Sequence, residues 1–315
     1  MSACTLCPRE CLADRTCEQG FCGGTDKIRI ARAALHFYEE PCISGSSGSG
    51  AVFFTGCPLR CVFCQNRSIA LSEYGEEVSP ERLSEIFFEL REQGANNINL
   101  VTPTHEAELI IPVIERAKKE GLDIPFVYNT GSYEKVEVLR RFEGLVDVWL
   151  PDLKYYSPEL SAKYSNAPDY FEVASKAIEE MVRQAGEPVF SETGKTTGEG
   201  LVSETGLIKR GVIVRHLVLP GCTKDSKAVI DYLYKTYGNS VYISIMNQYT
   251  PLITGKDAEK FPELTRRVTK REYAKVVDYA IELGVENAYI QEGKTAEESF
   301  IPAFDGTGVK RDKQG

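Results

Sequence analysis

Three cysteines stand close together in one short stretch, and their spacing suits the binding of an iron–sulfur cluster. Cys57, Cys61 and Cys64 fall within residues 55–66, here called the cysteine loop, directly after the apolar run 51–54. Iron–sulfur clusters are held by cysteine thiolates, and a four-iron cluster has four positions to fill. Three cysteines leave one iron open, and an open iron is where a further ligand can bind and react.

Other uses of clustered cysteines fit this loop less well. A zinc site usually has four Cys or His ligands, and the loop offers three. A redox dithiol would use Cys61 and Cys64 but would leave Cys57 without a role. Inert buried thiols seldom gather so densely. The spacing, the preceding apolar strand and the aromatic Phe63 all favour the cluster.

The N-terminus is also rich in cysteine. Five cysteines fall within the first two dozen residues: Cys4, Cys7, Cys11, Cys17 and Cys22. A segment this short has too little apolar content to fold alone and needs a covalent cross-link or a bound metal to stabilise it. Four thiolates can hold zinc tetrahedrally or bind a second four-iron cluster, and the sequence does not separate these two. Disulfides are the alternative, which a reducing compartment argues against.

Length and composition set the broad class. The chain has 315 residues, 42% of them hydrophobic, which is enough to bury the core of one large domain. Its formal net charge is −9, so we expect no broad basic surface and no nucleic-acid partner. No long uncharged apolar segment occurs, so we expect no membrane span and no secretion. Ten thiols that stay reduced indicate a cytoplasmic, anaerobic setting.

Short apolar runs alternate with amphipathic segments from about residue 50 to residue 293, which predicts parallel strands joined by helices. One helix is expected to begin after Ser79. Another should follow the capping box of Thr269 and Glu272 and stop at Gly284. Seven strands are predicted, at residues 50–54, 97–101, 124–128, 146–150, 211–219, 240–245 and 287–291. The expected fold is a partial or full parallel (β/α) barrel with a small Cys-rich extension.

In such a barrel the loops at the carboxyl ends of the strands converge on one mouth, so residues there can act together. The cysteine loop follows one strand end. The polar residues at the others are Asn129, Asp152, Lys154, Arg215, Asn247 and Gln248. All but Arg215 have a plain structural alternative: a turn for Asn129, an exposed ion pair for Asp152 and Lys154, and a polar strand end for the two later amides.

The CxxxCxxC spacing, with an aromatic residue before the last cysteine, resembles the radical S-adenosylmethionine superfamily. The resemblance implies that Cys57, Cys61 and Cys64 bind a 4Fe–4S cluster, whose open iron is chelated by the amino and carboxylate groups of S-adenosylmethionine. It also implies that Phe63 packs on the adenine of that cofactor.

The other strand ends extend the resemblance. Asp152-Leu153-Lys154 looks like the cofactor-contacting Asp-Leu-Lys of glycyl-radical activating enzymes, exemplified by the pyruvate formate-lyase activating enzyme. Arg215 lies on a strand similar to that family's Arg-containing strand, and its guanidinium fork would suit the cofactor's carboxylate or ribose. Asn129, Asn247 and Gln248 are expected to bind the cofactor as well, the last two at a ribose or an adenine edge.

One strand end departs from the superfamily. Most members have Gly-Gly-Glu where this chain reads Thr102-Pro103-Thr104-His105. His105 is expected to be a structural hydrogen bonder or a substrate-side acid or base. Two features resemble a pyruvate formate-lyase activating enzyme-like branch. One is this departure, and the other is an N-terminal CxxCPRxC pattern that is followed by Gly-Phe-Cys-Gly. That pattern matches Cys4, Cys7, Cys11 and Cys22 and leaves Cys17 out.

The resemblance implies a radical enzyme of oxidoreductase or lyase type that cleaves S-adenosylmethionine reductively to a 5′-deoxyadenosyl radical for hydrogen abstraction. Its electron donor would be a flavodoxin or ferredoxin, and its candidate substrate a glycyl-radical protein. Two alternatives stay open: a radical enzyme acting on a small molecule or another macromolecule, and a noncatalytic iron–sulfur or zinc electron-transfer protein. The expected organisation is a metal-binding extension at 1–30, the barrel at 31–300 and a C-terminal tail at 301–315.

Overall fold

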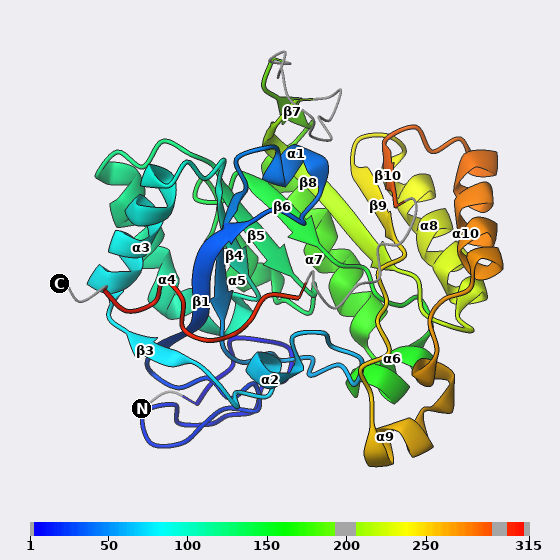
Figure 1. Ribbon diagram of the computed structural model, residues 1–315, viewed down its shortest axis with the longest axis horizontal. Helices are drawn as coiled ribbons and strands as arrows, with labels where there is room; N and C mark the ends of the chain where they lie inside the picture. The colour runs from blue at the N-terminus through cyan, green and yellow to red at the C-terminus, as the bar shows by residue number, and fades with distance from the viewer. Residues whose placement is uncertain (1–2, 193–205, 292–300, 312–315) are drawn as a thin grey trace.

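A parallel sheet forms the centre of the molecule (Figure 1). The computed structural model describes residues 3–192, 206–291 and 301–311. Its parallel strands are, in spatial order, β10 (Ala288–Ile290), β9 (Tyr242–Met246), β8 (Ile208–Leu217), β6 (Val148–Pro151), β5 (Phe126–Thr130), β4 (Ile98–Val101) and β2 (Ser49–Phe54). Each strand lies beside its predecessor in the chain, as in a (β/α) barrel, so the predicted fold class is confirmed.

Three further strands were not predicted. β1 (Ile28–His36) pairs antiparallel with β2, β3 (Glu76–Val78) pairs antiparallel with β1, and β7 (Val189–Phe190) pairs antiparallel with β8. In the described part of the chain β10 pairs with β9 alone, so the sheet is open between β10 and β3. The barrel is therefore partial.

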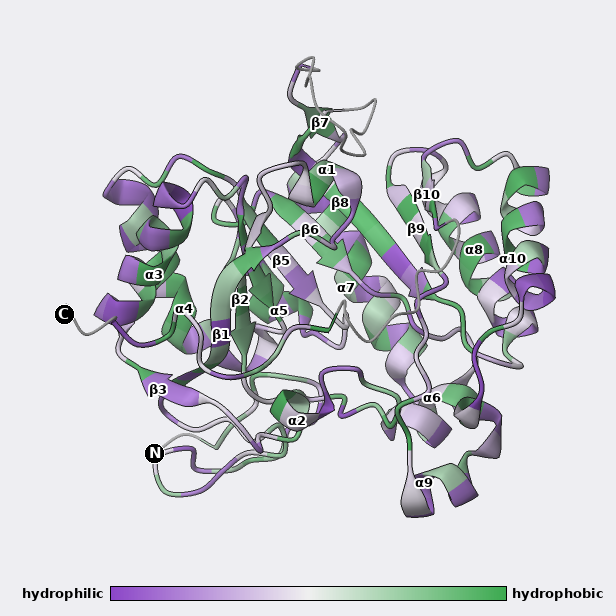
Figure 2. Cartoon of the chain, in the orientation of Figure 1, coloured by the Kyte–Doolittle hydropathy of each residue, from purple (hydrophilic) through white to green (hydrophobic). Residues whose placement is uncertain are grey.

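Helices cover the outer face of the sheet. The longer ones are α3 (Pro80–Glu92), α4 (Ala107–Lys119), α7 (Tyr170–Ala185), α8 (Thr223–Tyr237) and α10 (Lys270–Leu283). The shorter helices, of which α1 lies against the inner face, are α1 (Pro41–Ser44), α2 (Arg67–Ala70), α5 (Val136–Arg140), α6 (Pro158–Ser165), α9 (Gly255–Lys260), η1 (Thr104–Glu106) and η2 (Pro262–Thr265). The long helices turn hydrophobic stripes toward the sheet and hydrophilic stripes outward (Figure 2).

The predicted helix ends are confirmed. The Ser79 hydroxyl caps α3 by accepting a hydrogen bond from the Arg82 N–H at 3.2 Å. Thr269 and Glu272 form the expected capping box of α10, and Gly284 ends that helix with a left-handed φ of 89°. Local sequence signals therefore set where these two helices begin and where α10 stops.

The strands bury different residues on their two faces. On the outer face, residues such as Tyr128 and Trp149 join the main core under the helices. On the inner face, Val127 and Ile213 pack in a second cluster with Ile43 of α1. Side chains two positions apart on a strand share a face. Asn129 and Arg215 therefore continue the inner face beyond this apolar cluster, at the carboxyl ends of β5 and β8.

The two ends of the chain pack on different parts of the barrel. The N-terminal segment, here residues 3–24, lies across the carboxyl ends of the strands, which point downward in Figure 1. Residues 301–311, which were predicted as a tail, run along β1, where the Gly306 N–H donates to the Ala31 carbonyl at 3.0 Å. The segment ends on α3, where Arg311 pairs with Glu85.

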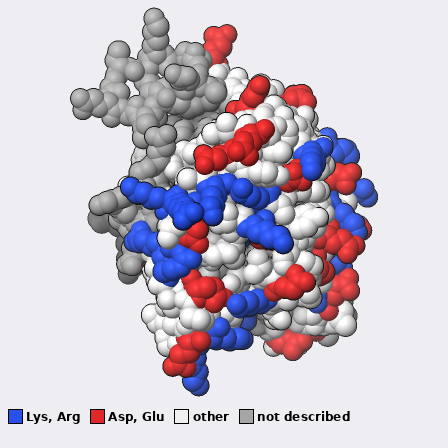
Figure 3. All heavy atoms as spheres, turned by 90° about the vertical axis from the view of Figure 1, so that its right-hand side faces the viewer, with Lys and Arg blue, Asp and Glu red and all other residues white. Residues whose placement is uncertain are grey.

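The outer flank formed by α8 and α10 carries acidic and basic side chains side by side (Figure 3). Lys235 and Asp231, one turn apart on α8, pair at 2.8 Å. Of the helices in the described ranges, none combines the length and apolar character that crossing a membrane requires.

Candidate active site at the carboxyl ends of the strands

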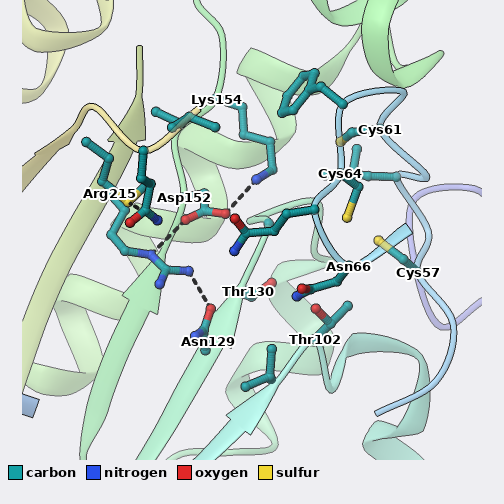
Figure 4. Close-up of a pocket in the computed structure, with 18 of the residues that line it drawn as sticks. Cys57, Cys61, Cys64, Asn66, Thr102, Asn129, Thr130, Asp152, Lys154 and Arg215 are labelled. Atoms are coloured by element: carbon teal, nitrogen blue, oxygen red, sulfur yellow. Dashed lines mark hydrogen bonds and ion pairs between the residues drawn. The ribbon is translucent and has the colours of Figure 1, made fainter. Parts of the chain in front are cut away.

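A cavity opens at the carboxyl ends of the strands, between the cysteine loop and the inner face of the sheet (Figure 4). Its lining includes Glu39, Cys57, Cys61, Phe63, Cys64, Asn66, Thr102, Asn129, Asp152, Lys154, Arg215 and Gln248. The structure thus brings together most of the predicted site residues. Asn247 is the exception, because it does not line this cavity.

The three cysteines of the loop stand along one wall of the cavity (Figure 4). Burial raises the pKa of Cys57 to about 11 and that of Cys64 to about 12, so a metal must displace their protons to bind. Across the described ranges, no three Cys, His, Asp or Glu side chains close around one point as ligands of a single ion do. Thiols spread along a wall suit a wider multi-iron cluster.

Beside the thiols, the buried Oδ1 of Asn66 has no hydrogen-bond partner among the described residues. A buried polar atom without a partner is costly unless a ligand or water completes it. Three soft sulfur donors and a free amide oxygen on one wall fit a 4Fe–4S cluster with a polar ligand next to it.

The shape of the cysteine loop depends on close backbone contacts. Gly56 has φ of 109°, and a Cβ there would come within 2.7 Å of the Cys22 carbonyl oxygen and 2.8 Å of His105 Nε2. A side chain at position 56 would therefore push the N-terminal segment away. That segment is tied to the loop directly, because the Cys57 N–H donates to the Cys22 carbonyl at 3.1 Å.

A buried ion-pair network faces the cysteines across the cavity (Figure 4). Asp152 accepts from Lys154 Nζ at 2.5 Å on one oxygen and from Arg215 Nε at 2.8 Å on the other. Arg215 also donates to Asn129 Oδ1 at 2.5 Å. The strands themselves hold this arrangement, since Asp152, just beyond the end of β6, forms a parallel bridge with Arg215 of β8.

Electrostatics keep the network charged. Burial alone would raise the pKa of Asp152, but Arg215 and Lys154 outweigh it and the pKa lies below its usual value. Burial would likewise lower the pKa of Lys154, yet Asp152 raises it above its usual value. At neutral pH the cavity therefore presents two fixed cations held by a carboxylate.

Sequence reasoning missed one member of this network. Glu39, in the loop between β1 and α1, accepts from Arg215 Nη1 at 3.0 Å, from Asn99 at 3.1 Å and from Asn129 at 3.2 Å. Burial raises its pKa, and Arg215 partly offsets this. The sequence does show two adjacent acidic residues, Glu39 and Glu40, before Pro41. They were not considered as site residues because the predicted sheet began at residue 50.

The end of β4 has an unusual backbone conformation. Thr102 lines the cavity and has φ of 58°, a left-handed conformation that is rare for a β-branched residue. His105 is 1% exposed, does not line the cavity, and donates from Nε2 to the Thr55 carbonyl at 2.7 Å. Burial lowers its pKa to about 4. The structural interpretation of His105 therefore holds, and this geometry gives it no access to a substrate.

The strained backbone at Thr102 leads to a prediction about stability. We expect Thr102→Gly to be more stable than Thr102→Ala by about 1 kcal/mol, because glycine adopts positive φ without the steric cost that a Cβ imposes. Urea unfolding of both variants measures the difference. The same pair at Thr265, in the 3-10 helix η2, serves as control and should show the opposite order. Equal stability at position 102 would contradict the strain.

The remaining predicted residues are placed as follows. Phe63 lines the cavity and makes edge contacts with Tyr155, Tyr164 and Tyr249, with ring centroids 6.3 to 6.4 Å apart. Gln248 lines the cavity too, and its Oε1 accepts from Gln291 at 3.1 Å. Phe63 is thus held rigidly by aromatic neighbours, and the Gln248 amide is oriented by another amide.

Four of the five N-terminal cysteines lie near one another, although in the described ranges they do not close around one point. The Sγ atoms of Cys11 and Cys22 lie 3.5 and 3.6 Å from where a Cβ on Gly20 would stand. The Cys11 thiol hydrogen-bonds to Cys4. Burial, then the nearby Cys22 and Cys4, raise the pKa of Cys7 to about 12.

The fifth N-terminal cysteine, Cys17, is exposed and hydrogen-bonds to the Asp14 carbonyl. The structure thus groups Cys4, Cys7, Cys11 and Cys22 and sets Cys17 apart.

Comparison with known proteins shows what this fold and site resemble. Residues 51–198 match the model of the radical SAM superfamily. The matched segment begins in β2 and includes the cysteine loop and the Asp152–Lys154 pair. This part of the chain is therefore similar to a radical SAM domain.

Individual proteins that resemble this chain share low sequence identity with it. An uncharacterized protein of Methanocaldococcus jannaschii is 26% identical over 299 residues, which are 91% of this chain and 76% of that protein. A radical SAM methyltransferase from Sphaerobacter thermophilus has a similar fold, with a TM-score of 0.50, 14% identity and coverage of 77% of this chain and 66% of that one. A domain of a pyruvate-formate lyase-activating enzyme from Bacteroides vulgatus aligns with a TM-score of 0.43, 12% identity and coverage of 63% and 100%.

Proposed function

We propose that this protein is a radical SAM enzyme whose Cys57, Cys61 and Cys64 hold a 4Fe–4S cluster. When bound, the reduced cluster supplies one electron that cleaves S-adenosylmethionine into methionine and a 5′-deoxyadenosyl radical, which abstracts hydrogen from a substrate. The observation that carries the proposal is the cavity itself, in which three thiols on one wall face the Asp152–Lys154–Arg215 network on the other.

The network has hydrogen-bond donors left over for a ligand. A guanidinium has five N–H donors, and Arg215 uses one each on Asp152, Glu39 and Asn129, which leaves two. Lys154 has three donors and uses one on Asp152. Because their partners hold both cations in fixed positions, these spare donors can bind a carboxylate or a ribose hydroxyl without much loss of side-chain freedom.

The decisive experiment is reductive cleavage. Protein reconstituted anaerobically with iron and sulfide is mixed with dithionite and S-adenosylmethionine, and 5′-deoxyadenosine is measured. The proposal expects its formation. A noncatalytic iron–sulfur or zinc electron-transfer protein would give none, and that outcome would reject the enzyme.

The substrate we propose is a backbone glycine of a glycyl-radical protein, with a flavodoxin or ferredoxin as electron donor. Its support is the likeness of Asp152-Leu153-Lys154 to the Asp-Leu-Lys of the activating enzymes. Incubation with a glycyl-radical protein should give a glycyl radical detectable by electron paramagnetic resonance. Hydrogen transfer from a small molecule, or from another macromolecule, without such a radical would favour the alternative substrate classes.

We also propose that Cys4, Cys7, Cys11 and Cys22 bind a metal, either zinc or a second iron–sulfur cluster. Its support is the grouping of these thiols, with the Gly24 N–H donating to Cys22 Sγ at 3.3 Å, as backbone amides often do to metal-bound sulfur. Zinc and iron analysis of the wild type and of Cys7→Ala tests this, with Cys17→Ala as control. Equal metal content in all three proteins would contradict the site.

A further inference from the structure

The sulfur of Cys61 receives a hydrogen bond from far along the chain. The Ser165 hydroxyl, at the last residue of α6, donates to Cys61 Sγ at 2.9 Å. Ser165 is 2% exposed, so water does not compete for this bond. Cys57 and Cys64 receive no such hydroxyl in the described part of the chain, which makes Cys61 distinct among the three thiols.

A second hydroxyl supports the first. The Tyr155 hydroxyl lies 2.7 Å from Ser165 Oγ, and Tyr155 is 1% exposed. Serine has one hydroxyl proton, so when Ser165 donates it to Cys61 the Tyr155 hydroxyl is the donor to Ser165. The result is a chain from the phenol through the serine hydroxyl to the sulfur, in which each bond strengthens the next.

The N-terminal segment fixes the position of this chain through Arg9. Its guanidinium donates to the Pro58 carbonyl at 2.8 Å, to the Ser165 carbonyl at 2.9 Å and to the Asn166 carbonyl at 2.5 Å. The last two are carbonyls at the end of α6, where a cation also suits the helix dipole. Pro58 belongs to the cysteine loop, so one side chain holds both the loop and the serine that contacts it.

Aromatic rings enclose this guanidinium. The Arg9 Cζ lies 4.7 Å from the ring centroid of Phe21 and 5.1 Å from that of Tyr133. Phe21 belongs to the N-terminal segment and Tyr133 to the loop after β5, so the Arg9 guanidinium packs against rings from two parts of the fold. Such a stacked and bonded arginine has little freedom to move.

We propose that Ser165, held in place by Arg9, sets the reduction potential of the cluster at Cys61, which makes the N-terminal segment a working part of the cluster site. The inference rests on the proposed function, since it assumes that Cys61 is a cluster ligand. Hydrogen bonds to cluster sulfurs stabilise the more negative reduced form and raise the potential. Tyr155, Ser165 and Arg9 are positioning residues in this account.

The test is a redox titration of the reconstituted cluster, followed by electron paramagnetic resonance without S-adenosylmethionine. We expect Ser165→Ala to keep its iron and to shift the midpoint potential downward, while Ser165→Thr, which keeps the hydroxyl, stays near the wild type. Ser175→Ala on the exposed side of α7 is the matched control. Full iron content with an unchanged potential in Ser165→Ala would overturn the proposal.

Substitution of Arg9 gives a second, independent test of the proposal. Arg9→Gln should shift the potential in the same direction, and the double variant with Ser165→Ala should shift it no further, because Arg9 acts by positioning the hydroxyl that Ser165→Ala removes. Arg91→Gln on α3, which loses only an ion pair with Asp123, is the control. Additive shifts would show that Arg9 does not act through Ser165.

A fallback variant and the behaviour of the wild type separate failure of this inference from failure of the proposed function. If Ser165→Ala does not fold, Tyr155→Phe removes the supporting donor instead, and a smaller downward shift is expected. If the wild type binds no cluster, the proposed function fails. If it binds a cluster whose potential ignores all these changes, the inference about Ser165 alone fails.

Discussion

Replacing Cys61 with alanine is expected to abolish both the cluster absorbance and the formation of 5′-deoxyadenosine, down to the level of a blank without protein. The cysteine loop supplies three thiolates, and the cluster has no protein ligand to spare. The measurements are iron content, the visible spectrum and product analysis after anaerobic reconstitution. The expected effect is the largest of all those considered, since it removes the reactive centre itself.

Cys17→Ala is the matched control for this change. Cys17 is exposed and lies apart from both cysteine groups, so the same chemical change there should leave iron content and cleavage as in the wild type. Retention of either the cluster or the cleavage activity in Cys61→Ala would contradict the ligand assignment. Loss of both in the control as well would point to general damage.

Asp152→Asn is expected to destabilise the protein by about 3 kcal/mol, because it leaves two buried cations without their shared carboxylate. Lys154 and Arg215 are 19% and 13% exposed at their side chains, so solvent cannot replace the lost charge. S-adenosylmethionine cleavage should also fall, since both cations lose the partner that orients them. Urea unfolding and product analysis measure the two effects.

The same substitution at Asp231 provides the comparison. Asp231 pairs with Lys235 within one turn of α8 at the surface, where solvent screens the charges. Asp231→Asn should therefore unfold at nearly the same urea concentration as the wild type and cleave as well as it does. If Asp152→Asn behaved likewise, the buried network would not contribute to stability as its geometry implies.

The parallel strands could be predicted because each is a short apolar run bounded by turn residues. All seven predicted strands occur, with ends displaced by a few residues at most. β1 escaped prediction for a physical reason. Its register shifts between Ile30 and Arg32, so the buried positions Ile28, Ile30, Ala31 and Ala33 do not keep a strict alternation. A bulge of this kind erases the period-two signal of a strand.

The site residues, like the strands, divide into those that the sequence predicts and those that it does not. Asp152, Lys154 and Arg215 were found because parallel strands align their carboxyl ends, and any polar residue there becomes a candidate. Glu39 was missed because a loop that precedes the barrel brings it to the inner face, and no local pattern reveals such a long-range contact. Asn247, also at a strand end, does not line the cavity, so position at a strand end alone does not place a residue in it.

The two chain ends have a practical consequence for handling this protein. Added residues ahead of Cys4 would start within the N-terminal segment, whose Arg9 donates to the Pro58 carbonyl of the cysteine loop at 2.8 Å. The described chain stops instead at Arg311, on the outer helix layer beside Glu85. A purification tag or a surface-immobilisation handle therefore belongs at the carboxyl terminus, where it leaves the segment that contacts the cysteine loop undisturbed.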